Sequence, residues 1–147
     1  MAGQRKPRAA TPESGSATAV DLCRLAMRAY DRGDFDQLAD LVHPDAVIEM
    51  VVLEGGAARG PRGVTDALTR AQEQVHRPTM TRLEPLGDDA VVMIGRIQYT
   101  DSRRGLTDRQ AAWLTVLKDG LIWRTRVLDS PRDAQRVYEE LVSGDDE

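Results

Sequence analysis

The stretch Gln110-Ala-Ala-Trp-Leu-Thr-Val-Leu-Lys118, followed by Asp119-Gly120 and then by Leu121-Ile-Trp-Arg-Thr-Arg-Val-Leu128, decides the fold. Two runs rich in apolar, β-branched and aromatic residues flank a two-residue turn signal. Asp-Gly is typical of a type I′ turn, because both central residues of that turn need a positive φ. The stretch therefore predicts a β-hairpin, whose two strands must be antiparallel.

More strands are expected on the N-terminal side of this hairpin. Apolar and polar residues alternate over Thr79–Leu86 and Ala90–Thr100, and Gly87-Asp88-Asp89 separates the two runs, which predicts two further antiparallel strands. The run Ala46–Leu53 is almost continuously apolar, with Glu49 as its exception. Such a run is typical of a strand that is buried on both faces.

Four helical patterns surround the strands. Thr18 can cap the first helix, because its hydroxyl can accept a hydrogen bond from an unpaired backbone N–H, and Gly33 ends it. Asp34 opens the second helix, Gln37 completes a capping box, and His43-Pro44 ends the helix because proline excludes the preceding residue from the α region. The helices expected lie at residues 18–33, 34–42, 64–76 and 130–141, and Ser130-Pro131 opens the last of them.

The element order predicts a single α+β domain. Helices packed on one face of a strongly curved antiparallel or mixed sheet bury the apolar surfaces of both. A sheet bent over helices in this way leaves a hollow at one end. We expect a disordered N-terminal arm over residues 1–17, the domain over residues 18–142, and an acidic tail over residues 143–147.

Composition restricts the partners. The net charge is −4 and aromatic residues are 4% of the chain, which disfavours nucleic-acid binding. No apolar run approaches the roughly 18 residues of a membrane span, and the single Cys23 cannot form an internal disulfide. The two histidines are too far apart for the usual metal-site spacing. We expect a cytoplasmic protein with no cofactor, metal, nucleic-acid or membrane partner.

Four motifs stand out in the sequence, namely Arg32-Gly-Asp-Phe-Asp-Gln-Leu38, Leu41-Val-His-Pro-Asp-Ala46, Gly60-Pro-Arg-Gly-Val64 and Lys118-Asp-Gly-Leu-Ile-Trp-Arg-Thr-Arg-Val-Leu-Asp129. In this order and spacing they resemble the SnoaL-like branch of the nuclear transport factor 2-like superfamily, whose members include polyketide cyclases, ketosteroid isomerases and limonene epoxide hydrolases. The resemblance spans about residues 18–142 and implies a conical α+β barrel with a mostly apolar cavity, often in a homodimer.

The resemblance supplies no complete catalytic set. An isomerase-like site needs a carboxylate base with a tyrosine and a protonated acid, and an epoxide hydrolase-like site needs an Asp-Arg-Asp set. Arg96 matches the arginine of the second set, while Gln98 and Arg126 stand where acids are needed. The three isomerase positions hold Met50, Leu25 and Trp113.

Polar residues on two strands are the candidates for binding a ligand. Arg96 and Gln98 share one face of their strand, as Arg124 and Arg126 share one face of theirs. The resemblance turns these faces inward, which would give the cavity a cationic end beside Trp113 and favour a polar or anionic ligand. The alternatives are a solvated outer face for the first pair and, for the second, salt bridges with acids at a dimer surface. Those acids are Asp101, Asp108 and Asp129.

Glu49 is the remaining candidate for chemistry. Burial of a lone carboxylate raises its pKa toward neutrality, as a general base requires, but pairing with an arginine is the alternative. Met50 and Trp113 are expected to line or fill the hollow, and Cys23 to be a structural thiol because no histidine is spaced to activate it.

Three hypotheses for function remain. We interpret the chain first as a SnoaL-like small-molecule-binding domain whose ligand the sequence does not identify. The second is a cyclase, isomerase or lyase acting on a natural-product intermediate, with Glu49 as base and Arg96 or Arg126 as oxyanion partner. The third is a dimeric interaction scaffold with a filled cavity. A homodimer is expected through the outer face of the sheet, which no helix is left to cover.

Overall fold

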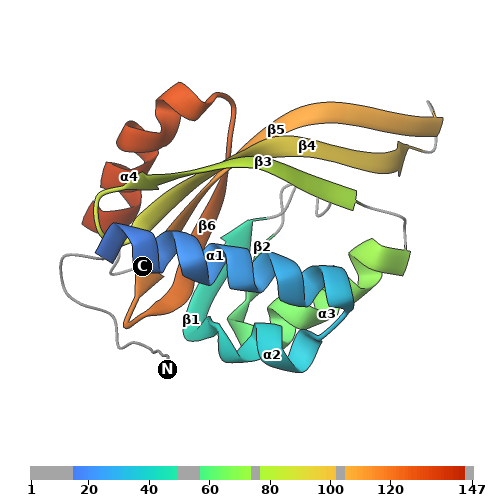
Figure 1. Ribbon diagram of the computed structural model, residues 1–147, viewed down its shortest axis with the longest axis horizontal. Helices are drawn as coiled ribbons and strands as arrows, with labels where there is room; N and C mark the ends of the chain where they lie inside the picture. Colours follow the sequence, from blue (N-terminus) through green and yellow to red (C-terminus); the bar gives the residue numbers. More distant parts are fainter. Residues whose placement is uncertain (1–14, 50–56, 74–76, 102–104, 145–147) are drawn as a thin grey trace, which may run out of the picture.

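The computed structural model describes residues 15–49, 57–73, 77–101 and 105–144 (Figure 1). The helices and strands follow the expected order along the chain, with one additional short strand. They are α1 (Gly15–Arg32), α2 (Phe35–Asp40), β1 (Val42–Glu49), β2 (Ala57–Arg59), α3 (Gly60–Glu73), β3 (Arg77–Leu86), β4 (Ala90–Asp101), β5 (Gly105–Lys118), β6 (Leu121–Leu128), a 3-10 turn over Pro131–Asp133, and α4 (Ala134–Ser143).

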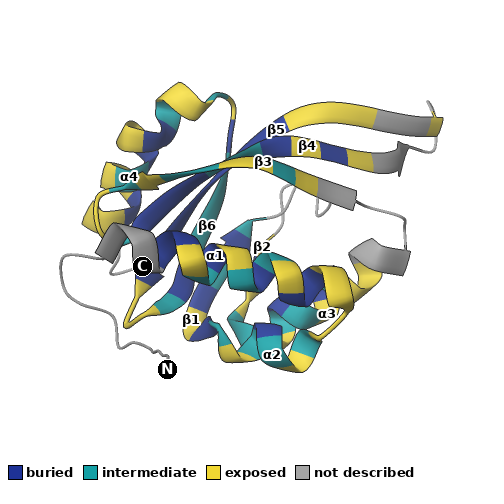
Figure 2. Ribbon diagram, viewed as in Figure 1, coloured by how far each residue is buried: buried dark blue, intermediate teal, exposed yellow. Residues whose placement is uncertain are grey.

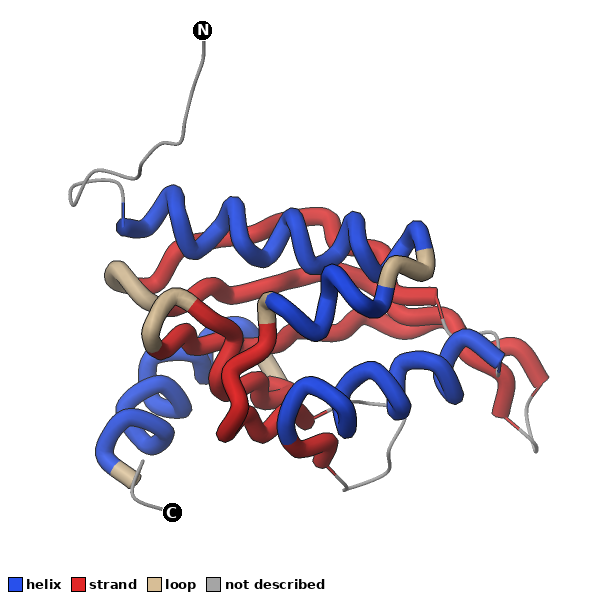
Figure 3. The backbone as a smooth tube through the Cα atoms, turned by 90° about the horizontal axis from the view of Figure 1, so that it is seen from below, coloured by secondary structure: helices blue, strands red, loops and turns tan. Residues whose placement is uncertain are grey.

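The six strands form one sheet in the order β2-β1-β6-β5-β4-β3. Every neighbouring pair is antiparallel except β1 and β6, which are parallel. The α+β architecture and the bent sheet are therefore confirmed. The sheet is mixed and stays open between its edge strands β2 and β3, so it is a cone rather than a closed barrel (Figures 1 and 3).

Three helices, α1, α2 and α3, cover one face of the sheet, which we call the inner face (Figures 1 and 3). A buried stripe runs along α1, as its apolar spacing predicts (Figure 2). The core formed here joins the three helices to β1, β4, β5 and β6. It includes Ala19, Cys23, Leu38, Val64, Ile48, Val91, Leu117 and Ile122.

The fourth helix lies on the opposite face, which we call the outer face. Buried residues of α4, among them Val137 and Leu141, pack there against Leu114, Val116 and Leu128. The expectation that all helices lie on one side of the sheet is wrong for α4. The physical reason is that β5 is buried on both faces, and its outer-facing leucine and valine need a cover as much as its inner-facing residues do.

The hairpin that decides the fold has the predicted geometry. Asp119 has φ +56° and Gly120 has φ +76°, as a type I′ turn requires. The turn places Lys118 opposite Leu121 and Leu117 opposite Ile122, and a one-residue register shift between Val116 and Leu117 then places Trp113 opposite Val127. The register of the two strands, and with it the face on which each side chain lies, is therefore set by the turn and this shift together.

Several expected boundaries are wrong by a few residues. The first helix begins at Gly15, so Thr18 lies inside it rather than at its cap. Asp34 does cap α2, since its side chain accepts a hydrogen bond from the backbone N of Gln37 at 3.2 Å, but α2 ends at Asp40. His43-Pro44 therefore lies within β1, where the pairing with β6 shifts register between Val42 and Val47. An irregular strand start tolerates a proline that a regular ladder would exclude.

Candidate functional site

The inner face carries an apolar surface that four strands build together, which we call the inner wall. Its residues are close to one another in the register but separate from most of the helix-covered core. Within the described residues, every member comes from a strand and none from a helix. The inner wall consists of Met80, Met93, Ile97, Ala111, Trp113 and Val127.

Trp113 stands at the centre of the inner wall. It lies opposite Met93 of β4 on one side and opposite Val127 of β6 on the other, and it is only 7% exposed. Two residues further along, Thr115 and Thr125 face each other, and their hydroxyl oxygens are 3.1 Å apart. The inner wall is therefore apolar. Beside it, on the side of the helix-covered core, these two threonines satisfy each other, because their hydroxyls form a hydrogen bond.

At the other end of the inner wall lies a charged residue. Arg109 is opposite Ile97 in the β4–β5 register and is exposed. Opposite residues of an antiparallel pair lie on the same face, so Arg109 lies on the inner side. Sequence reasoning missed Arg109, Met80 and Val127. Alternation counted from Trp113 along β5 would have found Arg109, whereas the faces of Met80 and Val127 depend on register shifts in the sheet.

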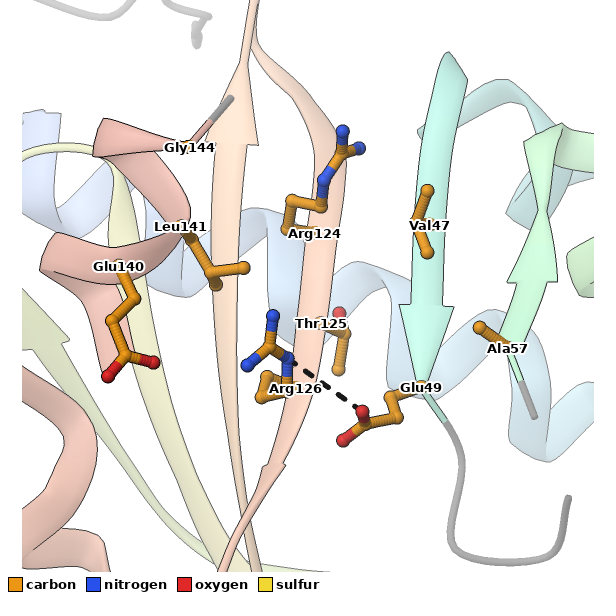
Figure 4. A pocket seen from close by; sticks show the side chains of 9 residues that line it. All are labelled: Val47, Glu49, Ala57, Arg124, Thr125, Arg126, Glu140, Leu141 and Gly144. Atoms are coloured by element: carbon orange, nitrogen blue, oxygen red, sulfur yellow. Dashed lines mark ion pairs between the residues drawn. The ribbon is translucent and has the colours of Figure 1, made fainter. Parts of the chain in front are cut away.

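A pocket of about 380 Å³ lies on the outer face, which we call the outer groove (Figure 4). Its floor comes from β1 and β6, and the end of α4 and strand β2 form its sides. The residues that line it are Val47, Glu49, Ala57, Arg124, Thr125, Arg126, Glu140, Leu141 and Gly144.

Glu49 holds the floor of the outer groove together. Backbone pairing of β1 with β6 ends at Ile48 and Thr125, and one residue later the side chain of Glu49 takes over. Its Oε1 accepts a hydrogen bond from the backbone N of Val127 at 2.8 Å, and its Oε2 lies 3.7 Å from Nε of Arg126. The expected alternative for Glu49, pairing with an arginine, describes the contact seen.

Arg124 is held by its neighbours beside the outer groove. Its guanidinium carbon lies 4.0 Å from the centre of the Trp123 ring, and its Nη1 donates to the carbonyl O of Asp45 at 3.0 Å. Glu140 faces the groove from α4, and its Oε2 accepts from Nη1 of Arg136 at 3.0 Å. Two guanidinium groups and two carboxylates thus share one pocket, and each carboxylate already has a donor.

The expected convergence of Arg96, Gln98 and Arg126 beside Trp113 is wrong. Trp113 lies opposite Met93, whereas Arg96 is three residues further along β4 and therefore on the other face. Arg126 lies opposite Leu114, which also belongs to the outer face. The prediction that Arg96 shares a face with Gln98, and Arg124 with Arg126, is correct. The prediction that these faces point inward is wrong, because both belong to the outer face.

Arg96 instead has a partner on its own face. Its Nε lies 3.0 Å from Oδ1 of Asp108 on β5, and Gln98 is exposed beside this pair. A solvated outer face, the alternative weighed for these residues, is what the geometry shows. The ligand-binding roles of Arg96, Gln98, Trp113 and Arg126 stay predictions, and Met50 lies outside the described residues.

Cys23 has the surroundings of an inert thiol. It is 2% exposed on α1, and burial raises its pKa to about 12. The thiolate form needed for nucleophilic attack is therefore scarce at neutral pH. In the described part of the chain, no group of three or more histidine, cysteine or acidic side chains has an arrangement that could hold a metal ion.

Around the inner wall, the inner-facing positions within residues 80–86, 91–97, 109–117 and 122–128 hold no carboxylate and no histidine. An acid or base for catalysis at the inner wall would have to come from other parts of the chain.

None of the described helices combines the length and the apolar composition that crossing a membrane requires.

Similar folds are found among solved structures. A candidate polyketide cyclase from Sinorhizobium meliloti is 18% identical, with a TM-score of 0.62 over 74% of this chain and 94% of that one. A Mycobacterium tuberculosis protein solved in complex with estradiol-17β-hemisuccinate is 16% identical, with a TM-score of 0.62 over 77% and 94%. TerC, co-crystallised with polyporic acid, is 16% identical, with a TM-score of 0.62 over 86% and 99%.

At these identities the likeness shows the fold alone. None of the functionally curated proteins matches the chain significantly. The SnoaL-like domain family, in contrast, matches residues 23–125, a range that runs from α1 into β6 and includes β1 to β5 completely. The chain therefore belongs to the SnoaL-like domain family, as its sequence motifs predict.

Proposed function

We propose that this protein binds a small organic molecule with an apolar body against the inner wall. The observation that carries the proposal is that residues of four strands form one apolar cluster to which no described helix residue belongs. The central residues of this cluster, Ile97, Ala111 and Trp113, are already buried, whereas Met80, Met93 and Val127 are only half-buried. Covering the apolar area that these three leave in water gains about 25 cal/mol per Å². An apolar ligand can provide that cover.

The inner wall also offers polar positions at two ends. Thr115 and Thr125 form a hydrogen-bonded pair of hydroxyls on the buried side, and Arg109 lies at the opposite, exposed end. A ligand with an acidic group at one end of an apolar body would fit this arrangement, since a guanidinium binds carboxylates well. Two structural neighbours were solved with organic acids, one with a steroid hemisuccinate and one with polyporic acid.

Fluorescence of Trp113 tests the proposal. The chain has two tryptophans, and Trp123 lies in the outer core, so a Trp123→Phe variant leaves Trp113 as the only indole. Titration with estradiol-17β-hemisuccinate or polyporic acid should change its emission saturably. Ala111→Leu in this background should abolish the change, because the added side chain fills space on the wall while keeping it apolar.

Arg109 has a matched control on the other face. Arg109→Gln should weaken binding of the hemisuccinate about tenfold, the loss of one charge-assisted hydrogen bond of roughly 1.4 kcal/mol. Arg96→Gln removes the same charge from the outer face and should leave the affinity unchanged. A folded Trp123→Phe protein whose Trp113 emission responds to neither compound at millimolar concentration would contradict binding at the inner wall and favour a filled scaffold.

Catalysis has no specific support from the geometry. The hypothesis of a cyclase, isomerase or lyase uses Glu49 as the base. Glu49, however, lies on the outer face beside Arg126. That side chain cannot reach a ligand held against Trp113, because the sheet lies between them. Any reaction at the inner wall would use other residues.

We also propose a homodimer, which rests on the family resemblance. The argument from an uncovered outer face is weakened, because α4 covers the apolar middle of that face. The part of the outer face that α4 leaves open includes Arg96 and Asp108, an opposite-charge pair that a two-fold interface could exchange between copies. Light scattering should give twice the chain mass at micromolar concentration, and a monomer mass would contradict the proposal. The cytoplasmic location stays a prediction.

A further inference from the structure

In the outer groove, the guanidinium group of Arg126 is paired with a described residue through Nε only. Among the described residues, Glu49 is the only one that forms an ion pair with Arg126, with its Oε2 3.7 Å from Nε. The terminal nitrogens Nη1 and Nη2 of Arg126 have no hydrogen-bond partner in the described part of the chain. The side chain is 39% exposed, so these terminal donors are open both to solvent and to an anionic ligand that enters the outer groove.

The two carboxylates of the outer groove are already engaged. One oxygen of Glu49 accepts a hydrogen bond from the backbone N of Val127 at 2.8 Å. One oxygen of Glu140 accepts a hydrogen bond from Nη1 of Arg136 at 3.0 Å. Neither carboxylate has the side-on, two-oxygen geometry that satisfies the guanidinium of Arg126 best. Figure 4 shows Arg126 projecting from β6 between Glu49 of β1 and the end of α4, while Arg124 lies further along β6 with its guanidinium directed away from Arg126.

The remaining lining sets the character of a ligand. Val47, Ala57 and Leu141 give the outer groove apolar side walls, and the volume of about 380 Å³ suits a molecule of modest size. We propose that the outer groove is a second binding site, which takes a small organic carboxylate with its charged end on Nη1 and Nη2 of Arg126 and its apolar part against these walls.

This site is distinct from the inner wall. On β6, Arg124 and Arg126 point to the outer face, while Thr125 and Val127 lie opposite Thr115 and Trp113 on the inner face. The sheet separates the two sites. Trp113 belongs to the inner wall, whereas Trp123 lies in the outer core and contacts a lining residue of the outer groove, Arg124. Trp123, on which Arg124 stacks at 4.0 Å, reports the outer groove, so failure at one site leaves the other testable.

Titration with sodium benzoate tests the proposal. In the wild-type protein, the backbone amide resonance of Val127, whose N–H donates to Glu49, and the Nε–H resonance of Arg126 should shift saturably in ¹H–¹⁵N spectra. Emission of Trp123 in a Trp113→Phe variant should follow the same binding curve. Arg126→Gln should raise the dissociation constant about tenfold, and Arg96→Gln, on the same face but outside the groove, should leave it unchanged.

A second variant distinguishes the site from general attraction to positive charge. Glu49→Gln keeps an oxygen that can accept from Val127 but removes the charge that competes for Arg126, so benzoate should bind about three to ten times more tightly, a gain of roughly 0.6–1.4 kcal/mol. Equal effects of Arg126→Gln and Arg96→Gln, or no saturable shift at Val127, would overturn the proposal. If Arg126→Gln does not fold, unchanged or weaker binding in Glu49→Gln would overturn it.

Discussion

Gly95 shows how one residue supports the inner wall. A Cβ added at Gly95 would collide with the carbonyl oxygen of Thr79 on β3. Strand β3 approaches so closely because its pairing with β4 shifts register between Met80 and Arg82. Bulges bend a strand, and a glycine without a side chain permits the close approach that follows. The bulge also re-aims Met80 toward the inner wall, to which it belongs.

We predict that Gly95→Ala destabilises the protein by about 1–3 kcal/mol, because the methyl group must displace backbone atoms. Denaturant unfolding measures the loss. Gly63→Ala in helix α3 is the matched control, since the atom nearest to a Cβ added there is 3.8 Å away, and this variant should be neutral or stabilising by up to about 1 kcal/mol. Equal stability of parent and Gly95→Ala would show that β3 does not approach β4 this closely.

A second residue-scale prediction concerns Cys23. Burial raises the pKa of its thiol to about 12, so thiolate is scarce at pH 8. The native protein should not react with 5,5′-dithiobis(2-nitrobenzoate) over an hour, and one thiol should react promptly in guanidinium chloride. Fast reaction of the folded protein would mean that α1 opens readily or packs differently.

At the scale of elements, α4 decides what the outer face can do. It covers the apolar residues of β4, β5 and β6 and at its end forms one side of the outer groove. Ser130 starts this segment, since its hydroxyl accepts from the backbone N of Arg132 at 3.3 Å. Tyr138 then ties α4 to the β3–β4 turn, where its hydroxyl donates to Oδ1 of Asp89 at 2.9 Å.

The contact of Tyr138 makes the docking of α4 sensitive to alkaline pH. Desolvation, followed by the hydrogen bond to Asp89, raises the pKa of Tyr138 above 10.0. A raised folded-state pKa means that the contribution to stability is complete below about pH 10 and is lost as the pH rises through the folded-state value. Because the side chain is partly exposed, the effect is small.

Tyr138→Phe tests this sign. At pH 8 it should lose about 0.5–1 kcal/mol, the contribution of one hydrogen bond. Between pH 9 and about pH 11, stability of the parent should fall more steeply than that of the variant, so the two denaturation curves converge. Curves that stay parallel across this range would show that Tyr138 and Asp89 are not coupled in solution.

On the scale of the whole molecule, one sheet serves two cores. Leu38 of α2 belongs to the inner core and is 4% exposed, whereas Leu128 of β6 belongs to the outer core and is 6% exposed. Both cores share strands β4, β5 and β6. Loss of packing on either face should therefore weaken the same cooperative unit.

We predict that Leu38→Ala and Leu128→Ala each lower the free energy of unfolding by about 2–5 kcal/mol. Both variants should still unfold in one transition, coincident by far-ultraviolet circular dichroism and by tryptophan fluorescence. Two separated transitions in either variant would contradict a single domain over residues 18–142 and would assign α4 and its outer core to an independently melting layer.

Local patterns in the sequence predicted the elements well. The Asp119-Gly120 turn, the β5–β6 hairpin and the cap at Asp34 each depend on a few adjacent residues, and their physics is contained in those residues. Alternation likewise showed that Arg96 shares a face with Gln98. The motifs of the family carried the prediction of the fold as a whole, which the match over residues 23–125 confirms.

The identity of each face was decided only by tertiary structure. Alternation along a strand is local, but whether a face is inner depends on which helices pack on it and on pairing between residues far apart in the chain. The parallel pairing of β1 with β6 brings Glu49 to Arg126 from a distant part of the sequence, and the placement of α4 turns both into groove residues. No short segment contains that information, because the energy that selects it is the burial of both faces of the sheet at once.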